Sequence, residues 1–138
     1  MSVIFENYTN DVIKAIEKLG EQWLEEASGV LESQVKRNTV VATGKTKGSW
    51  EHSVDTAKME ARIGSNYENA IWEEFGTGIY ASGGNGRKTP WVYKDEKGFH
   101  RTRGKKPRRA LQNAKNQKES EIINLLKHKL RGLEWNLF

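Results

Sequence analysis

The chain has 138 residues, the size of one ordinary domain with one hydrophobic core. It contains no cysteine, which excludes disulfides, thiolate metal sites and cysteine nucleophiles. No run of residues is long and apolar enough for a membrane span, and the first residues lack the pattern of a signal peptide. We therefore expect a single domain over residues 1–138, made and kept in cytoplasm, with no membrane partner.

The net charge of +5 is unevenly distributed along the chain. Residues 1–37 carry 4 basic and 7 acidic side chains, and residues 38–86 carry 4 and 6. Residues 87–109 carry 10 basic and 2 acidic side chains, a net charge of +8. Such a dense basic segment favours a polyanion or an acidic protein surface as its partner.

The first predicted element is a long amphipathic helix over residues 8–37, because apolar side chains recur there at the helical period. The apolar positions are Val12, Ile16, Leu19, Trp23, Ala27 and Val30, with Ile13, Leu24, Leu31 and Val35 beside them. Asn10 and Asp11 can cap its start. Gly20 and Gly29 are points where it can bend or admit another helix closely.

An antiparallel hairpin is predicted next. Residues 38–48 form a turn-rich connection, and residues 49–54 and 58–63 then predict two strands. In the second strand, Ala61 and Ile63 alternate with charged residues, as a half-buried strand requires.

A short helix that ends in glycine is predicted within residues 67–78, YENAIWEEFGTG. Its large side chains lie four residues apart and share one face: Tyr67, Ile71 and Phe75, with Ala70 beside them. We expect that face to be buried. Gly76 and Gly78 are expected to end the helix, since glycine takes positive φ without a steric cost.

A glycine-rich loop and a second hairpin follow. Residues 91–94 and 99–103 predict two strands around a turn at residues 95–98. We expect residues 79–106 to be a mobile loop and basic hairpin that a partner orders. Pro107 suits a place at or near the first position of a last helix, which Gly132 is expected to end.

The short-helix segment resembles the EFGTG signature of small minor tail or tail-completion proteins, encoded in the morphogenesis clusters of long-tailed phages and prophages. The matching positions are Tyr67, Ala70, Glu74, Phe75, Gly76, Thr77 and Gly78. A second block, residues 83–107, is similar to the glycine-rich loop, aromatic hairpin and closing lysine-proline of that family. One departure is that Pro107 leads directly into Arg108, without the usual aromatic-leucine-proline segment. How the last helix docks therefore stays open.

The resemblance implies a non-enzymatic virion protein of the tail-completion or head-to-tail joining class. It implies an α+β fold, with a small antiparallel β-sheet packed against a long N-terminal helix and a C-terminal helix. It also implies a homo-oligomeric ring, expected to be hexameric. The ring would lie between the tail tube or tail terminator protein and the head connector or stopper protein, in the tail or neck of the virion after assembly in host cytoplasm.

Partner contacts are expected from the basic hairpin. The candidate residues are Arg87, Trp91, Tyr93, Phe99, Arg101 and Arg103. Aromatic rings beside cations can also stack bases while the cations hold phosphate. A small DNA-binding or DNA-packaging accessory protein is therefore the alternative, and within a ring the same hairpin could touch passing DNA non-specifically.

No catalytic set, cofactor or metal site is predicted. The histidines are far apart in sequence and none has a second histidine at ligand spacing: His52, His100 and His128. Glu73 and Glu74 are adjacent, so they point to different sides of a helix and are expected to be solvated or capping charges. Residues 83–89, GGNGRKT, lack the spacing of a phosphate-binding loop and lead toward Pro90 and a strand, which argues against nucleotide binding.

Overall fold

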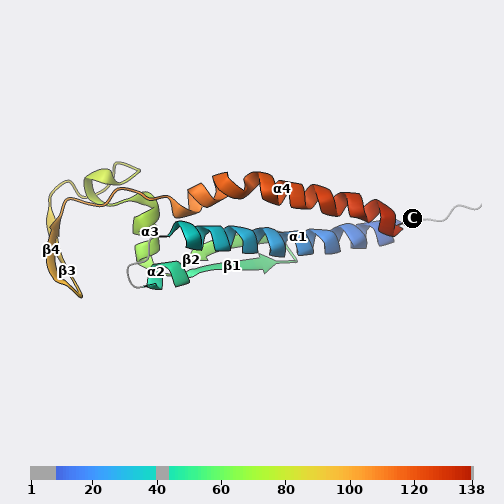
Figure 1. The fold of residues 1–138 in the computed structure, drawn as a ribbon, viewed down its shortest axis with the longest axis horizontal. Coiled ribbons are helices and arrows are strands. Elements are labelled where there is room, and N and C mark those ends of the chain that lie inside the picture. The colour runs from blue at the N-terminus through green and yellow to red at the C-terminus, as the bar shows by residue number, and fades with distance from the viewer. Residues whose placement is uncertain (1–8, 40–43, 138) are drawn as a thin grey trace, which may run out of the picture.

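A computed structural model of the chain describes residues 9–39 and 44–137. In chain order the elements are α1 (Thr9–Asn38), α2 (Lys45–Gly48), β1 (Trp50–Asp55), β2 (Glu60–Ser65), α3 (Glu68–Phe75), the 3-10 turn η1 (Gly78–Tyr80), β3 (Trp91–Asp95), β4 (Gly98–Thr102) and α4 (Ala110–Leu137). The predicted α+β fold is confirmed, with two separate two-stranded antiparallel sheets. The molecule is elongated, and the β3–β4 hairpin lies at the end opposite to the start of α1 (Figure 1).

The two long helices run antiparallel to each other, and the β1–β2 hairpin packs against α1 (Figure 1). Polar contacts fix the pairing of the helices along their length. The indole Nε1 of Trp23 donates to the carbonyl oxygen of Ile122 at 2.7 Å, and Lys129 Nζ lies 3.0 Å from Glu26 Oε1. At the other end of the pair, Asn38 Nδ2 donates to the carbonyl oxygen of Ala110 at 3.1 Å.

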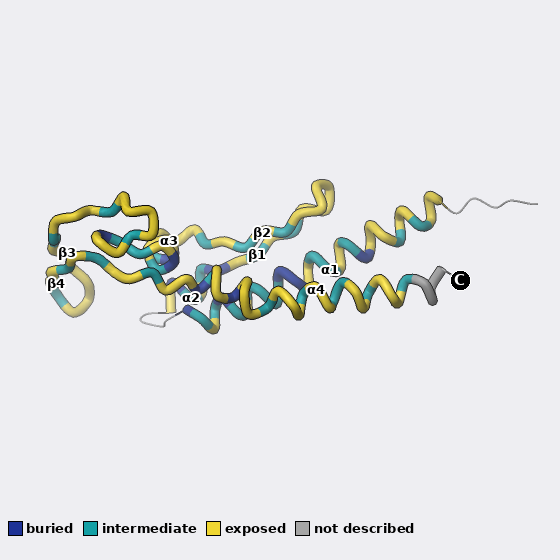
Figure 2. The backbone as a smooth tube through the Cα atoms, turned by 90° about the horizontal axis from the view of Figure 1, so that it is seen from above, coloured by how far each residue is buried: buried dark blue, intermediate teal, exposed yellow. Residues whose placement is uncertain are grey.

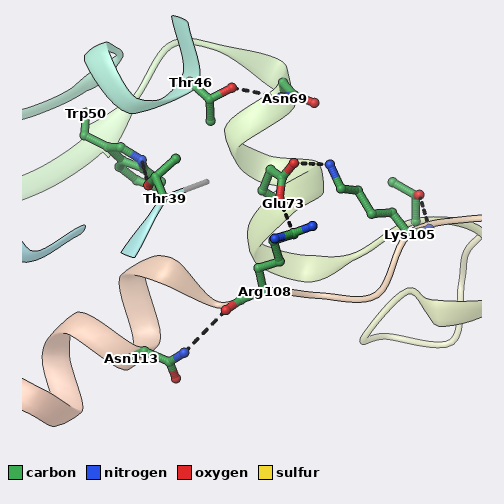
Figure 3. Close-up of polar contacts among 9 residues, drawn as sticks. Thr39, Thr46, Trp50, Asn69, Glu73, Lys105, Arg108 and Asn113 are labelled. Atoms are coloured by element: carbon green, nitrogen blue, oxygen red, sulfur yellow. Dashed lines mark hydrogen bonds and ion pairs between the residues drawn. The ribbon is translucent and has the colours of Figure 1, made fainter. Parts of the chain in front are cut away.

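The hydrophobic core lies where α1, β1, α3 and α4 meet, in the middle of the molecule (Figure 2). Its buried members are Val35, Trp50, Ala70, Ala110 and Ala114. The three alanines leave room for the Trp50 indole, whose Nε1 donates to Thr39 Oγ1 at 3.0 Å (Figure 3). Thr39 Oγ1 in turn donates to the Val35 carbonyl oxygen at 2.7 Å, so the buried polar atoms of this cluster are satisfied.

The predicted apolar face of α1 is confirmed in part. Leu19, Ala27 and Val35 are buried, whereas Ile13 and Ile16 near the N-terminal end are about half exposed. The expected close approach of another helix does not occur at Gly20. Instead the tip of the β1–β2 hairpin approaches there, and a Cβ on Gly20 would collide with the Met59 side chain.

The β1–β2 hairpin is confirmed, with Trp50 opposite Ser65 and His52 opposite Ile63. The connection before it contains α2, and residues 40–43 of that expected turn lie outside the described residues. His52 joins the hairpin to α1, because its Nε2 donates to Glu25 Oε1 at 2.8 Å and its Nδ1 lies 3.4 Å from Glu32 Oε1. The hydrogen bond to Glu25 raises the pKa of His52 above its ordinary value of 6.5.

The short helix forms as α3 and ends at Gly76, which has φ 77°, but the prediction of its buried face is wrong. Tyr67, Ile71 and Phe75 are 39%, 54% and 55% exposed, whereas Ala70 and Glu74 on the neighbouring stripe are buried. The reason is steric and polar. The small Ala70 allows close packing on the core, and Glu74 is needed at the start of α4.

The last helix begins near its predicted start but runs past its predicted end. It begins at Ala110, three residues after Pro107, and continues through Gly132 to Leu137. Its start is set by Glu74, whose carboxylate accepts the backbone N–H groups of Leu111 and Gln112 at 2.9 and 3.0 Å. The negative charge there also suits the positive end of the helix dipole. In the described part of the chain, no helix combines the length and apolarity that crossing a membrane requires.

Candidate partner interface on a basic arm

Residues 79–102, which we call the arm, leave the body of the protein at α3 and return to it just before α4 (Figure 1). The base of the arm is made by two backbone segments, residues 76–78 and residues 103–105. Thr77 N donates to the Lys105 carbonyl oxygen at 2.9 Å, and Ile79 N donates to that of Arg103 at 3.1 Å. Lys105 N donates to Thr77 Oγ1 at 2.9 Å. The base is thus a short backbone ladder.

The ladder explains why glycine recurs at these positions. A Cβ on Gly78 would collide with the carbonyl oxygen of Arg103, and a Cβ on Gly104 would collide with that of Thr77. Both glycines also have positive φ, 61° for Gly78 and 133° for Gly104. A Cβ on Gly86 would in turn meet the carbonyl oxygen of Gly78. The glycines therefore permit close approach of three chain segments.

Glu73 ties the returning chain to α3. Its carboxylate forms ion pairs with Lys105 Nζ and, at 3.2 Å, with Arg108 Nε (Figure 3). The Arg108 backbone N also donates to the Glu73 carbonyl oxygen at 2.7 Å. The expectation that both are solvated or capping charges is therefore right for Glu74, which caps α4. It is wrong for Glu73, whose side chain is 14% exposed and held in ion pairs.

The β3–β4 hairpin presents two different faces. Trp91 lies opposite Thr102, Tyr93 opposite His100, and Lys94 opposite Phe99. Because successive side chains in a strand alternate between faces, the register separates the candidate residues. Trp91, Tyr93, Asp95 and His100 share the first face; Val92, Lys94, Phe99 and Arg101 share the second.

The first face is tied together by contacts within the arm. The Tyr93 and His100 rings stack with centroids 5.2 Å apart, and the Arg87 guanidinium lies 5.8 Å from the Trp91 ring centroid. His100 Nε2 donates to Asp95 Oδ1 at 2.8 Å, and this hydrogen bond lowers the pKa of the Asp95 carboxyl.

The second face is open. Phe99 is 75% exposed and Val92 is 61% exposed, which are high values for large apolar side chains. The ammonium of Lys94 lies 5.4 Å from the Phe99 ring centroid, and Arg101 is exposed on the same face. This face can therefore offer apolar contact area and positive charge together, which suits an acidic protein surface or a nucleic acid.

The six predicted partner residues are thus not one surface. Arg87, Trp91 and Tyr93 lie on the first face, and Phe99 and Arg101 on the second. Arg103 stands at the base, where its carbonyl oxygen is part of the ladder and its side chain is exposed. Val92 and Lys94 were missed, although strict alternation with Trp91 and Tyr93 could have assigned them to the Phe99 face.

No family model matches this sequence, and no curated protein or solved structure is significantly similar to it. Among the described residues, no three histidine or acidic side chains are placed to share a metal ion.

Proposed function

We propose that this chain is a structural virion protein of a tailed bacteriophage or prophage, which joins or completes the tail at the head–tail interface as a subunit of a ring. The observation that carries the proposal is the arm. The segment from Glu74 to Gly78 that resembles the tail-completion signature also builds the end of α3 and one side of the arm's base. In this proposal the signature segment is needed because it shapes the base from which the arm extends.

The arm suits docking on a large preformed partner. A two-stranded hairpin alone in water is marginally stable. Contact with a tail tube, terminator, connector or stopper protein would therefore order it. The charges of residues 87–109 would attract an acidic surface from a distance, and Phe99 and Val92 would then be buried in the contact. The proposed role includes no catalytic step.

Electron microscopy of lysates from the parent phage with this gene deleted tests the proposal. A joining role is supported by separate DNA-filled heads and complete tails, and tails of abnormal length would move the role to tail termination. Empty heads beside normal tails would point to DNA packaging or retention. Intact infectious particles would refute the structural role.

A second candidate, a DNA-binding or DNA-packaging accessory protein, is favoured by the cation–aromatic pairs on the arm, Arg87 with Trp91 and Lys94 with Phe99. Duplex binding that weakens steeply with salt would support it, because each phosphate contact releases counterions. Absence of binding near physiological salt would exclude it.

A further inference from the structure

The α3 helix carries an apolar surface that its own chain leaves open. Ile71, Trp72 and Phe75 are 54%, 49% and 55% exposed, although α3 has eight residues. Large apolar side chains that are exposed next to one another are typical of interaction sites. The α3 helix lies between the long helix pair and the β3–β4 hairpin (Figure 1).

Ile71 and Phe75 line a groove of about 490 Å³, which we call the α3 groove. The other apolar side chains of its lining are Leu31 of α1, Trp50 of β1, Ala70 of α3 and Leu111 of α4. A volume of this size is within the range of sites that hold small ligands or several side chains. The charged residues in the lining are Arg109, Lys115 and Glu74, and the Glu74 carboxylate is already occupied by the N–H groups at the start of α4. The α3 groove therefore fits a short apolar segment that carries a negative charge.

We propose that the α3 groove binds residues 2–8 of a second copy of this chain. That segment, SVIFENY, places Val3, Ile4 and Phe5 in a row and follows them with Glu6. The apolar residues match the lining, and Glu6 is complementary to Arg109 and Lys115. The basic arm of a neighbour also has exposed apolar side chains, but Lys94 and Arg101 beside them repeat the charge of the groove.

Geometry requires the segment to come from another copy. Residues 1–8 can span at most about 29 Å, because an extended chain advances up to about 3.6 Å per residue. They precede Thr9, and Leu31 lies about 33 Å farther along α1 at 1.5 Å per residue. Figure 1 shows the start of α1 and α3 toward opposite ends of the body. The segment therefore falls short of its own groove.

Such a contact joins different surfaces of two copies. A head-to-tail contact of this kind generates a ring when its rotation closes. The inference deepens the proposed function, since it names the contact between neighbours in the proposed ring. It concerns self-association, so it can be tested on the purified full chain without phage particles.

The absence of cysteine makes a disulfide test specific. Two full-length single variants, Phe5→Cys and Ile71→Cys, are mixed at high subunit concentration and oxidised by copper-phenanthroline and air, which accept the electrons and protons of the two thiols. We expect a covalent dimer that contains one chain of each variant. Dithiothreitol should return the dimer to single chains, because it reduces the disulfide. The bond forms only between Cβ atoms about 4 Å apart, so its formation reports close contact of the two positions.

The matched control replaces one partner by Phe99→Cys, which places an exposed thiol on the arm. Phe5→Cys with Phe99→Cys should give no more dimer than either variant alone. A dimer between Ile71→Cys and Phe99→Cys would mean that a neighbour's arm fills the groove and would overturn the proposal. Absence of the Phe5–Ile71 dimer would overturn it as well.

A second measurement separates docking from folding. Phe5→Glu should lower the weight-average mass in sedimentation equilibrium and leave the melting temperature unchanged, because the core of the described residues is built from α1, β1, α3 and α4. The gene-deletion phenotype is independent of these results. If the covalent dimer forms but phage lacking the gene still makes intact particles, the virion role alone is refuted. If that phage makes separate heads and tails but the dimer does not form, the docking alone is refuted.

Discussion

The carboxylate of Glu74 in α3 accepts the backbone N–H of Leu111 in α4 at 2.9 Å, across 37 positions of sequence. The same carboxylate accepts a hydrogen bond from Gln112 N at 3.0 Å. A buried side chain of one helix thus caps the start of another. Helix starts leave such N–H groups without intrahelical partners, so they need an acceptor from elsewhere.

Replacing Glu74 by Ala should therefore lower the free energy of unfolding by about 1–3 kcal/mol, because two N–H groups lose their acceptor. Urea denaturation followed by circular dichroism measures the loss. The control is Glu121→Ala, the same change at an exposed site of α4, which should stay within about 0.5 kcal/mol of the parent. Equal losses in the two variants would mean that the Glu74 contact contributes nothing.

Gly78→Ala tests the base of the arm. The new Cβ meets the Arg103 carbonyl oxygen and also forces alanine to positive φ, so we expect a loss of about 2–4 kcal/mol. Gly84→Ala is the matched control, since Gly84 has φ 69° with no atom near the added Cβ. It should show the backbone cost alone, about 1–2 kcal/mol. Hydrogen exchange at the Thr77 and Ile79 amides should quicken in the first variant and not in the second.

Two tryptophans should respond very differently to truncation. Trp50 is 5% exposed in the core, so Trp50→Ala should cost about 3–5 kcal/mol of stability. Trp72 is 49% exposed, and Trp72→Ala should cost less than about 1 kcal/mol in the isolated chain. Thermal unfolding of both variants checks this order, and the reverse order would contradict the placement of the core.

The His52 contact predicts a dependence of stability on pH. The folded state raises the pKa of His52 above 6.5, so the stabilisation is complete below pH 6.5 and is lost as the pH rises through the raised pKa. The melting temperature should therefore fall with rising pH in that window. The double variant Glu25→Gln, Glu32→Gln should lose this component, and an unchanged slope in it would show that another group is responsible.

Removing charge from the arm and its base should affect assembly and leave folding intact. In the variant Arg101→Gln, Arg103→Gln we expect an unchanged melting temperature, because both side chains are exposed, and impaired rescue of the gene deletion. Lys58→Gln, Arg62→Gln removes the same charge from the β1–β2 hairpin and should rescue normally. A large loss of stability in the arm variant would instead assign these arginines to the fold.

Local patterns in the sequence were sufficient for the elements themselves. Both hairpins follow from alternation around turn residues, and the Gly76 end of α3 follows from the need for positive φ. The fold class could therefore be predicted, because each of these signals acts over a few residues.

The packing of α3 could not be predicted by the same means. The stripe of Tyr67, Ile71 and Phe75 is the larger apolar surface, but Ala70 and Glu74 face inward. What decides the orientation is distant in sequence: the space around Trp50 and the open N–H groups of α4. Small and polar residues carry little hydrophobic signal, so a rule based on periodicity selects the wrong stripe.

The prediction of where α4 ends failed for a different reason. Glycine inside a helix costs about 1 kcal/mol relative to alanine, which a long helix can absorb. Gly132 accordingly lies within α4. At the candidate interface, the residue types were found from composition, but their division between two faces depends on a cross-strand register that the turn at residues 95–98 sets.

The adjacency of Glu73 and Glu74 has a mechanical consequence. Glu73 holds the returning chain of the arm, and Glu74 holds the first turn of α4. A rotation of α3 about its axis therefore pulls on both attachments at once. A displacement of α3 would therefore move the returning chain and the start of α4 together, because both are attached to consecutive residues of one short helix.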